Sequence, residues 1–389
     1  MAHPKQVSVK PTATEAAIKE FEANIAQPAK ESKAEAQQGE TAPALQDLKP
    51  SGELVEEWDK AWESGKETAI STGFPALDAL LDGGLYPGLY SMGAITSLGK
   101  TTFALQIADY IAASGKDVLY VTLEQSAAEL ASKTLSRMTK AMHPKSPGDW
   151  LTYRQITSKN KRSTLGPDQK KALADAIGEY KKGSGKHFYT LAGIGDVGVE
   201  RIRKQIEEHQ KKHGTTPVIF IDYAQILAEY REKLTDKQNV DKNIVELKRM
   251  ARDLNTPLFV ISSLNRDNYV VRISLAAFKE SGAIEYTSDC IIGLQPQGLE
   301  KGQDDKVKAR NSQVIEKCKN SPTRKLEAVI LKNRQGSCGG VNFEYDTLHN
   351  LYTDRGAAEN PYTAQAEKPK QKTEAEHKRA DQLPAGKPV

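Results

Sequence analysis

The ten residues GAITSLGKTT, at positions 93–102, lie between a short apolar run and a helix-like segment. From Ala94 to Thr101 the spacing is small-x-x-x-x-Gly-Lys-Thr, which is typical of a phosphate-binding loop. Such a loop turns backbone N–H groups toward phosphates, while its lysine reaches the β and γ oxygens and its hydroxyl holds Mg²⁺. Gly99, Lys100 and Thr101 supply these groups at the start of a helix, whose N-terminus favours anions. The stretch therefore predicts a nucleotide site between a strand and a helix.

Ala94 occupies the position where the first glycine of this pattern is usually found. A single methyl is compatible with the loop if φ is negative there, and we expect the preceding Gly93 to supply flexibility. The predicted nucleotide-binding residues are Ala94, Ser97, Gly99, Lys100, Thr101, Thr102 and Asp222.

Two acidic residues each follow an apolar run. Residues 218–221 are apolar and lead to Asp222. Ligands of parallel sheets bind at the carboxyl ends of the strands, so we expect Asp222 to hold Mg²⁺ beside Thr101, although a terminal aspartate also caps turns. Glu124 ends the run that follows the phosphate-loop helix. There it could polarise an attacking water, or serve as an acid at the N-terminus of the next helix.

Outward from the loop, residues 70–354 alternate between apolar runs and amphipathic segments. Runs such as DVLYVTLE, TPVIFIDYAQ and TPLFVISS end in small or polar residues, and helix-like segments such as TTFALQIADYIAASG lie between them. Alternating strands and helices favour a mainly parallel central sheet that helices cover on both faces. The predicted fold class is α/β.

The flanking segments have a different composition. Residues 1–50 and 356–389 are rich in Ala, Glu, Lys, Gln and Pro, so we expect both to be disordered tails. In residues 51–68, Leu54, Trp58 and Trp62 share one helical face. This segment is expected to be a linker helix that packs on its own domain or docks on a neighbouring subunit. The domain proper then spans residues 69–355.

Composition argues against several classes of protein. The three cysteines are well separated and form neither a disulfide framework nor a zinc motif. No apolar run approaches the roughly 18 residues of a membrane span, and the first residues lack a signal peptide's apolar stretch. We therefore expect a cytoplasmic protein with no membrane partner.

Local charge is more informative than the net charge of +4, which permits nucleic acid as a partner without arguing for it. The basic region 141–187 is either a solvated charged face or a patch for DNA or a partner. The polar insertion 298–325 is expected to be a surface loop.

Lys332 and Arg334 alternate on one side of a strand end that runs into the turn RQGSCGG. They form either an exposed hairpin or a finger that reaches the γ-phosphate of a neighbouring subunit. An arginine acting in trans in this way can accelerate hydrolysis by roughly 10³–10⁵.

These motifs, in this order, resemble the C-terminal ATPase domain of the DnaB-type replicative helicases over about residues 70–354. IDYAQIL is close to the family's Asp-Tyr-Leu-Gln motif, and LEQSAAELASKTLSRM resembles its Leu-Glu-x-Ser/Pro helix. FKESGAIEYTSDCIIGL is close to its Arg-Glu-Ser-Gly-x-Ile-Glu run, and KNRQGSCG to its Lys-x-Arg-x-Gly finger. The resemblance implies a RecA-like P-loop fold, ATP as the nucleotide, and a homo-hexameric ring that moves along single-stranded DNA.

The resemblance also implies roles for individual residues. The implied ATP site in cis consists of Lys100, Thr101, Glu124 and Asp222, with Mg²⁺ held by Thr101 and Asp222. The implied finger in trans consists of Lys332 and Arg334. The loop implied to touch the DNA backbone consists of Lys279, Glu280 and Gly282. A cation beside a glycine-bearing turn suits contacts to phosphates, which position DNA without reading its sequence; an ordinary strand–helix connection is the alternative.

Two departures from the family leave alternatives open. The family's glutamine after the fourth strand is Ser263 here, so we expect altered coupling between nucleotide state and DNA contact. The residues before Ile70 are too few and too polar for the family's N-terminal helical domain. We therefore expect a primase or loader in a separate chain and a mobile-element origin. The principal prediction is an ATP-dependent DNA helicase of DNA replication. The alternative is an ATP-switched DNA-binding module (a loader, repair mediator or recombinase relative) without processive unwinding.

Overall fold

The computed structural model describes residues 50–63, 69–193, 197–227, 234–265, 269–278 and 282–358, without the side chains at positions 57, 58, 61, 62 and 226. The chain divides into two units, Met1–Ser64 and Gly65–Val389. In the first unit, helix α2 spans Ser51–Glu63, within the segment expected to be a linker helix. Residues 1–49 and 359–389, where the tails are expected, lie outside the described residues, as do the side chains of both tryptophans of α2.

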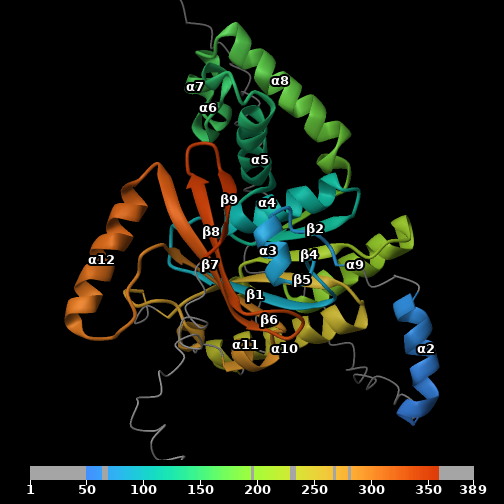
Figure 1. The fold of residues 1–389 in the computed structure, drawn as a ribbon. Helices are drawn as coiled ribbons and strands as arrows, with labels where there is room; N and C mark the ends of the chain where they lie inside the picture. The colour runs from blue at the N-terminus through green and yellow to red at the C-terminus, as the bar shows by residue number, and fades with distance from the viewer. Residues whose placement is uncertain are drawn as a thin grey trace, which may run out of the picture. The chain divides into compact units, whose positions relative to one another are not determined.

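The second unit is built on a nine-stranded sheet in the order β3-β2-β4-β5-β1-β6-β7-β8-β9 (Figure 1). The strands are β1 Gly88–Ala94, β2 Val118–Thr122, β3 Phe188–Ala192, β4 Val218–Asp222, β5 Pro257–Ser263, β6 Cys290–Pro296, β7 Thr323–Asn333, β8 Gly339–Asp346 and β9 Leu351–Ala357. The first six pair in parallel, and β7, β8 and β9 extend the sheet antiparallel. The predicted α/β class with a mainly parallel sheet is confirmed.

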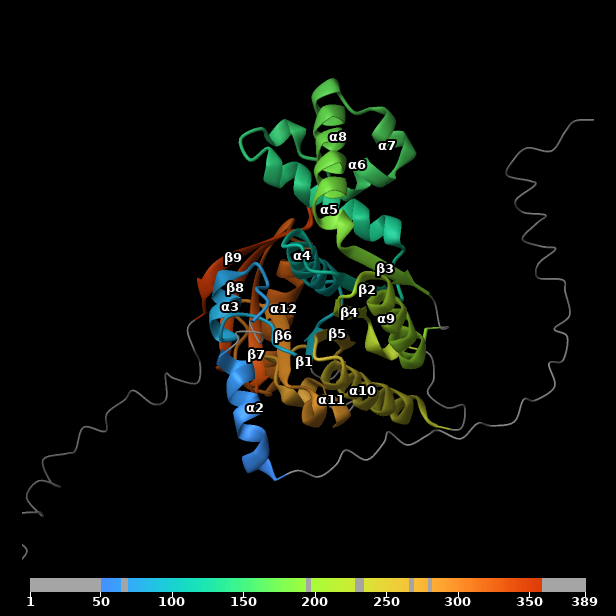
Figure 2. The same cartoon turned by 90° about the vertical axis from the view of Figure 1, so that its right-hand side faces the viewer.

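Helices cover both faces of this sheet, as Figures 1 and 2 show. The described helices of this unit, some of which lie away from the sheet, are α3 Pro75–Leu80, α4 Lys100–Ala113, α5 Ala127–Met142, α6 Tyr153–Thr157, α7 Lys159–Ser163, α8 Pro167–Lys182, α9 Val199–His213, α10 Asp236–Asp253, α11 Gly282–Thr287 and α12 Asp305–Asn320. Among the described residues, no helix combines the length and the apolar composition that crossing a bilayer requires.

Alternation along the strands divides the core into two clusters. In β1, Tyr90 and Met92 join the cluster that contains Phe103 of α4. Leu89 points to the opposite face, where the second cluster contains Ile206 of α9 and Leu247 of α10. Every residue of β1 is buried, as expected for a central parallel strand with helices on both faces.

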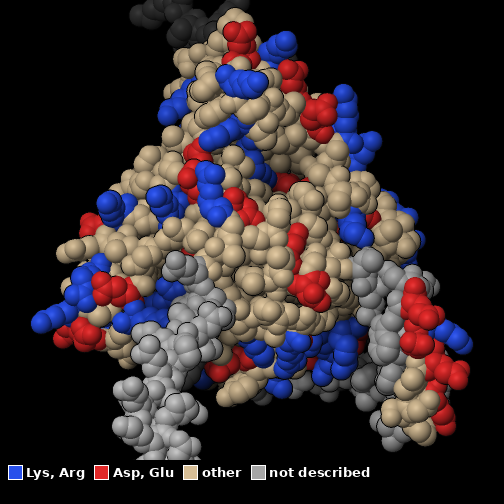
Figure 3. Space-filling view, in the orientation of Figure 1, with Lys and Arg blue, Asp and Glu red and all other residues tan. Residues whose placement is uncertain are grey.

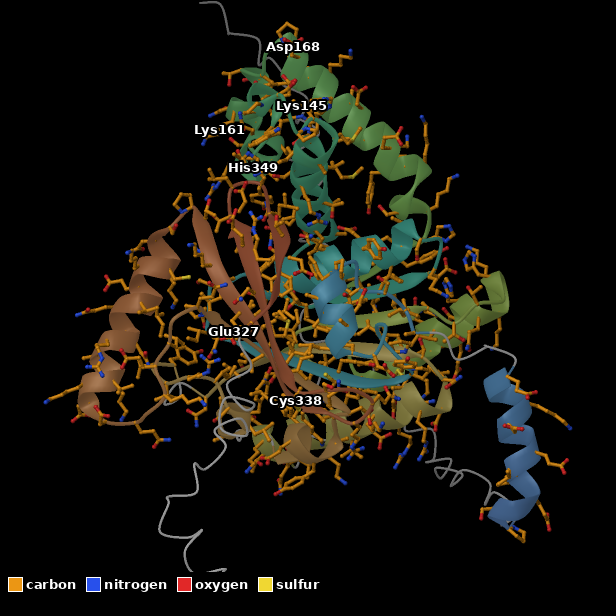
Figure 4. All side chains as sticks on the ribbon, viewed as in Figure 1. Lys145, Lys161, Asp168, Glu327, Cys338 and His349 are labelled. Atoms are coloured by element: carbon orange, nitrogen blue, oxygen red, sulfur yellow. The ribbon has the colours of Figure 1, made fainter. Side chains whose placement is uncertain are left out.

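Helices α5 to α8 form a helical cap with its own small core of Leu151, Ile156, Leu165 and Leu173. The cap is attached to the turn between β8 and β9. Lys140 Nζ lies 2.6 Å from Asp346 Oδ2, and the Trp150 ring meets the His349 ring edge-on at 5.5 Å. Figure 4 shows Lys145, Lys161 and Asp168 in the cap, with His349 at its base. The basic region 141–187 is therefore folded, and any contact of its charges with DNA or a partner stays a prediction.

The expected surface loop at 298–325 is wrong, because this insertion contains the sixteen-residue helix α12. Asp304 caps the helix by accepting hydrogen bonds from the backbone N–H groups of Lys306 at 3.0 Å and Val307 at 2.9 Å. The buried face consists of Val307, Asn311 and Ile315. The helical period was hidden because a polar asparagine occupies the middle of that face.

Candidate nucleotide site

The phosphate loop joins β1 to α4 at the carboxyl edge of the parallel strands, in the middle of the sheet. The chain turns there through Ser97, at φ 69°, and Gly99, at φ 97°. A Cβ on Gly99 would lie 2.6 Å from the Tyr352 hydroxyl and 2.7 Å from the Tyr345 ring. Only glycine satisfies both the backbone angle and the space at this position.

Ala94 is the last residue of β1, fully buried, and its φ is not among the positive values of the described residues. The condition under which alanine is compatible with the loop is therefore met. Gly93 has a different role from the one expected. A Cβ there would lie 2.4 Å from Leu264 and 2.6 Å from the Phe278 ring, and its φ is not positive either. Close packing, rather than flexibility, requires glycine at position 93.

Four of the predicted residues form one charged cluster beside the loop. The Thr101 hydroxyl donates a hydrogen bond to the carboxylate of Asp222, which ends β4 and is 2% exposed. Burial raises the pKa of Asp222, and the bond from Thr101 and the charge of Lys100 act in the opposite direction. Burial lowers the pKa of Lys100, whereas Asp222 and Glu124 raise it. Lys100, Thr101, Glu124 and Asp222 therefore interact with one another beside the loop, and their roles in nucleotide binding stay a prediction.

Lys133, which the sequence reasoning missed, brings a second lysine to this cluster. Its Nζ donates to Gln125 Oε1 at 2.8 Å. Burial lowers the pKa of Lys133, and Asp222 and Glu124 are among the charges that raise it. The available signal was the capping box at Ser126, two residues after Glu124, because it fixes the start of the helix whose second turn carries Lys133.

Residues that are far from the phosphate loop in the sequence hold it in place through hydrogen bonds to its carbonyl groups. A guanidinium nitrogen of Arg324, on β7, donates to the carbonyl oxygen of Ser97. The Tyr352 hydroxyl donates to the carbonyl oxygen of Leu98 at 2.9 Å. The rings of Tyr345 and Tyr352 stack with their centroids 4.3 Å apart. No local pattern could reveal these contacts, since the pairing of β7, β8 and β9 brings them to the loop.

The predicted finger lies at the other edge of the sheet. Ala94 pairs with Leu294, which pairs with Ala328 of β7. From that level β7 runs antiparallel, away from the phosphate loop, to Asn333, which pairs with the first residue of β6. Lys332 and the residue two positions beyond it therefore lie at the amino edge of the parallel strands. The structure does not bring the finger to Lys100 of its own chain.

Within the chain the finger is held by polar groups of its neighbours. Lys332 Nζ donates to the Glu285 carbonyl oxygen at 2.7 Å. Arg334 Nη1 lies 3.2 Å from Asp289 Oδ1, and the arginine side chain is 51% exposed. Lys248 Nζ bonds the other oxygen of Asp289 at 2.5 Å. Figure 3 shows Lys and Arg side chains gathered along the lower rim, where Figure 1 places α10 and the end of β7.

Of the predicted DNA-contacting residues, Lys279 and Glu280 lie outside the described residues, and Gly282 is the first residue of α11. The segment before them is anchored at two points. Phe278 packs against β1 at Gly93. Arg272 makes two hydrogen bonds of 2.9 Å to the carboxylate of Glu327, which Figure 4 shows in the middle of β7.

Ser263, which stands in place of the family's glutamine, is the last residue of β5. Its backbone N–H donates to Gln225 Oε1 at 3.2 Å, and Gln225 Nε2 donates to Ser262 Oγ at 2.8 Å. The glutamine of IDYAQ therefore connects the turn after Asp222 to the end of β5. This contact reaches the strand that leads toward the predicted DNA loop.

Comparison with known proteins agrees with this geometry. The family model for the DnaB-like helicase C-terminal domain matches residues 69–354. The replicative DNA helicase DnaB of Helicobacter pylori is 26% identical over 310 residues, which cover 74% of this chain and 59% of that protein. The replicative DNA helicase DnaC of Bacillus subtilis is 26% identical over 330 residues, which cover 82% of this chain and 64% of that protein. The chain thus spans about 60% of the length of these relatives.

Solved structures show the same fold. A DnaB-like replicative helicase, described with its interactions with primase, superposes with a TM-score of 0.62 at 21% identity, over 77% of this chain and 67% of that one. A separately solved ATPase domain superposes with a TM-score of 0.64 at 21% identity, over 79% of this chain and 99% of that domain. The RecA-like fold is therefore confirmed, and the chain belongs to the DnaB-like helicase C-terminal domain family.

Proposed function

We propose that this chain is an ATP-dependent DNA helicase that hydrolyses ATP between the subunits of a homo-hexameric ring and moves along single-stranded DNA during replication. One observation carries the proposal beyond family membership: the described groups suited to ATP hydrolysis are divided between opposite edges of the sheet. Lys100, Glu124 and Asp222 lie at the carboxyl edge, and Arg334 lies at the amino edge. Head-to-tail packing of identical subunits would unite them, and such packing forms a ring when the rotation from one subunit to the next closes.

Each residue of the cis cluster has a chemical role in this proposal. Backbone N–H groups of the loop and the Lys100 ammonium bind the β- and γ-phosphates. Glu124 is exposed at the end of the strand, where it orients the attacking water and accepts its proton. Lys133 fixes the segment that carries Glu124 through its bond to Gln125.

The donor set also fits Mg²⁺, which favours oxygen ligands from one or two carboxylates together with the phosphates of a nucleotide. The Thr101 hydroxyl and the Asp222 carboxylate are hydrogen-bonded to each other, so two such oxygens already lie together. When bound, Mg²⁺ supplies positive charge against the β- and γ-phosphates.

In trans, Arg334 of one subunit stabilises the charge on the γ-phosphate bound by the next subunit. Its contacts with Asp289 and a backbone carbonyl keep the guanidinium oriented until that interface forms. Lys279, Glu280 and Gly282 are proposed to contact the DNA backbone inside the ring. A primase or loader is expected as a separate chain, and the solved relative described with primase supports that expectation.

The alternative, an ATP-switched DNA-binding module, is favoured by Ser263, whose short hydroxyl reaches less far than a glutamine amide. Strand separation of a forked DNA duplex with ATP and Mg²⁺ distinguishes the two functions. We expect the native chain to separate the strands and Lys100→Ala to lose both separation and hydrolysis. A native protein that hydrolyses ATP without separating the fork would contradict the helicase function and support the alternative.

A further inference from the structure

The insertion that contains α12 carries an excess of positive charge. Residues 301–325 hold eight Lys and Arg residues and three Asp and Glu residues, a net charge of +5, whereas the whole chain carries +4. The rest of the protein is therefore slightly acidic. The other basic segment is the helical cap at residues 141–187, which holds ten Lys and Arg residues and four Asp and Glu residues. A local positive excess of this kind is an electrostatic footprint rather than an average property of the surface.

Three of the five cations on α12 lie along one exposed flank of the helix. With 3.6 residues per turn, Lys306, Arg310 and Lys317 fall on one exposed stripe, on the flank of the helix beside its buried face. The stripe is roughly 16 Å long, at 1.5 Å of rise per residue. Arg310 is paired with Glu300 at 2.7 Å on the surface, and neither lysine of the stripe makes an ion pair with any described residue. Figure 3 shows both blue and red side chains along this flank of the molecule.

α12 is also connected to the nucleotide site. Arg324, just after the helix, donates one hydrogen bond to the carbonyl oxygen of Lys319, in the last turn of α12, at 2.8 Å. Its other terminal nitrogen donates to the carbonyl oxygen of Ser97 in the phosphate loop. A ligand that binds α12 therefore binds an element fixed to the loop that cradles the nucleotide.

We propose that α12 is a second contact for the sugar–phosphate backbone of DNA, separate from the predicted loop at 279–282. The inference rests on the proposed DNA-directed function. Figure 1 shows α12 beyond the β7 side of the sheet and α11, which begins at Gly282, below it. A linear row of cations matches a polyanion, whose phosphates bind without regard to sequence.

An acidic protein partner fits this surface less well. Stable protein interfaces are anchored by buried aromatic or apolar side chains at their centre. The large exposed hydrophobic residues of the described chain are Val55, Tyr110, Met142, Val245, Tyr286 and Leu348, and none lies on α12. The helix offers charge without an apolar anchor.

The salt dependence of DNA binding tests the proposal. The test variant combines Lys306→Gln, Arg310→Gln and Lys317→Gln. The matched control combines Lys204→Gln, Lys211→Gln and Lys212→Gln on α9, which removes the same charge from exposed residues. Each protein is titrated with a single-stranded oligonucleotide and with a blunt duplex. The binding constant is measured at several salt concentrations between about 50 and 200 mM. Thermal unfolding of both variants checks that the fold is intact.

Three phosphate contacts contribute about 2 to the slope of log K against log salt for single strands and about 2.7 for duplex DNA. We expect the salt slope of the α12 variant to fall by this amount on one of the two DNAs, and that DNA, single-stranded or duplex, is then the one that α12 contacts. The α9 control is expected to keep the native slope on both DNAs. Unchanged slopes on both DNAs would overturn the proposal and leave an acidic protein as the partner to examine. Equal loss in the α9 control would also overturn it, because net charge alone would then explain the effect.

The outcome is separable from that of the proposed function. None of the three α12 residues belongs to the nucleotide site, so basal ATP hydrolysis should equal that of the native chain. If the native chain fails to separate a fork but the α12 variant still loses its slope, the DNA contact stands and the helicase function fails.

Discussion

The divided site leads to a quantitative prediction about two inactive variants. Ala328 lies level with the end of the phosphate-loop strand, and Asn333 lies five residues farther along β7. At about 3.4 Å per residue the finger is therefore about 17 Å away along the sheet, farther than an arginine side chain reaches. Lys100→Ala removes the phosphate-binding group of a subunit and leaves its finger, while Arg334→Ala does the reverse.

The ATPase rate of each variant alone should be at least about 10³-fold lower than that of the native chain, because every interface lacks either Lys100 or Arg334. In rings assembled from equal amounts of the two variants, an intact interface needs Lys100 from one subunit and Arg334 from its neighbour. Random assembly produces that combination at about one quarter of the interfaces of a closed heterologous ring. Two inactive proteins should therefore regain up to about one quarter of the native ATPase rate when they are co-assembled.

The two variants are co-expressed with different affinity tags, purified through both tags in succession, and assayed for phosphate release with single-stranded DNA. A co-assembly of Lys100→Ala with the double variant Lys100→Ala, Arg334→Ala is the matched control, since it contains no intact interface. Arg334 is half exposed, so its replacement should leave the fold intact. Absence of any recovery at all mixing ratios would refute action in trans, and with it the argument from sheet register.

Three further predictions concern the cis site and the helical cap. Ala94→Gly should retain nucleotide binding and lower the free energy of unfolding by about 1 kcal/mol, because glycine weakens an extended strand and one buried methyl is lost; thermal unfolding and ATP titration measure the two effects. Lys133→Met should lower the turnover number by about tenfold or more with little change in KM, and Lys133→Arg should restore most of it, whereas a purely structural lysine would give equal losses for both. Burial raises the pKa of Asp346, but hydrogen bonds from His349 and Lys140 hold it well below its usual value. Its stabilising effect is therefore complete above the ordinary aspartate pKa of about 3.9 and lost as pH falls through the folded value. Asp346→Asn should cost about 1–2 kcal/mol at pH 7. The difference in stability between the variant and the native chain should begin to shrink as pH falls below about 4 and should continue to shrink toward the folded pKa of Asp346; a constant difference would contradict the reasoning.

The sequence was most informative where the chemistry is local. The phosphate loop, the acid after β2 and the acid after β4 could be predicted because each follows its own buried strand, and parallel strands bring their carboxyl ends to one edge. Lys100 and Asp222 meet for this reason, although they are far apart in the chain. The role of Gly93 was misjudged, since its requirement comes from Leu264 and Phe278 and not from the backbone of the loop.

Contacts made by the antiparallel strands could not be predicted in the same way. The position of Arg324, Tyr345 and Tyr352 depends on which strands pair beyond β6 and in which register. Nothing in their local sequence specifies that choice. α12 was missed for a related reason, because Asn311 is buried by hydrogen bonds to Glu300 rather than by apolar contact. A polar residue inside a helix's buried face removes the periodic signal on which helix prediction depends.

The antiparallel extension also explains why the proposed enzyme needs a ring. β7 begins at Arg324's end of the sheet, where it contacts the phosphate loop of its own chain, and it ends with the finger at the opposite edge. The six parallel strands alone place their functional groups at one edge and provide no route to the other. A strand that reverses direction crosses the sheet once and carries a cation to the far side. On the proposed function, each subunit therefore binds one nucleotide at the ends of its parallel strands and completes its neighbour's site with the end of β7. Hydrolysis then requires assembly, because the fold keeps the two halves of each site on different subunits.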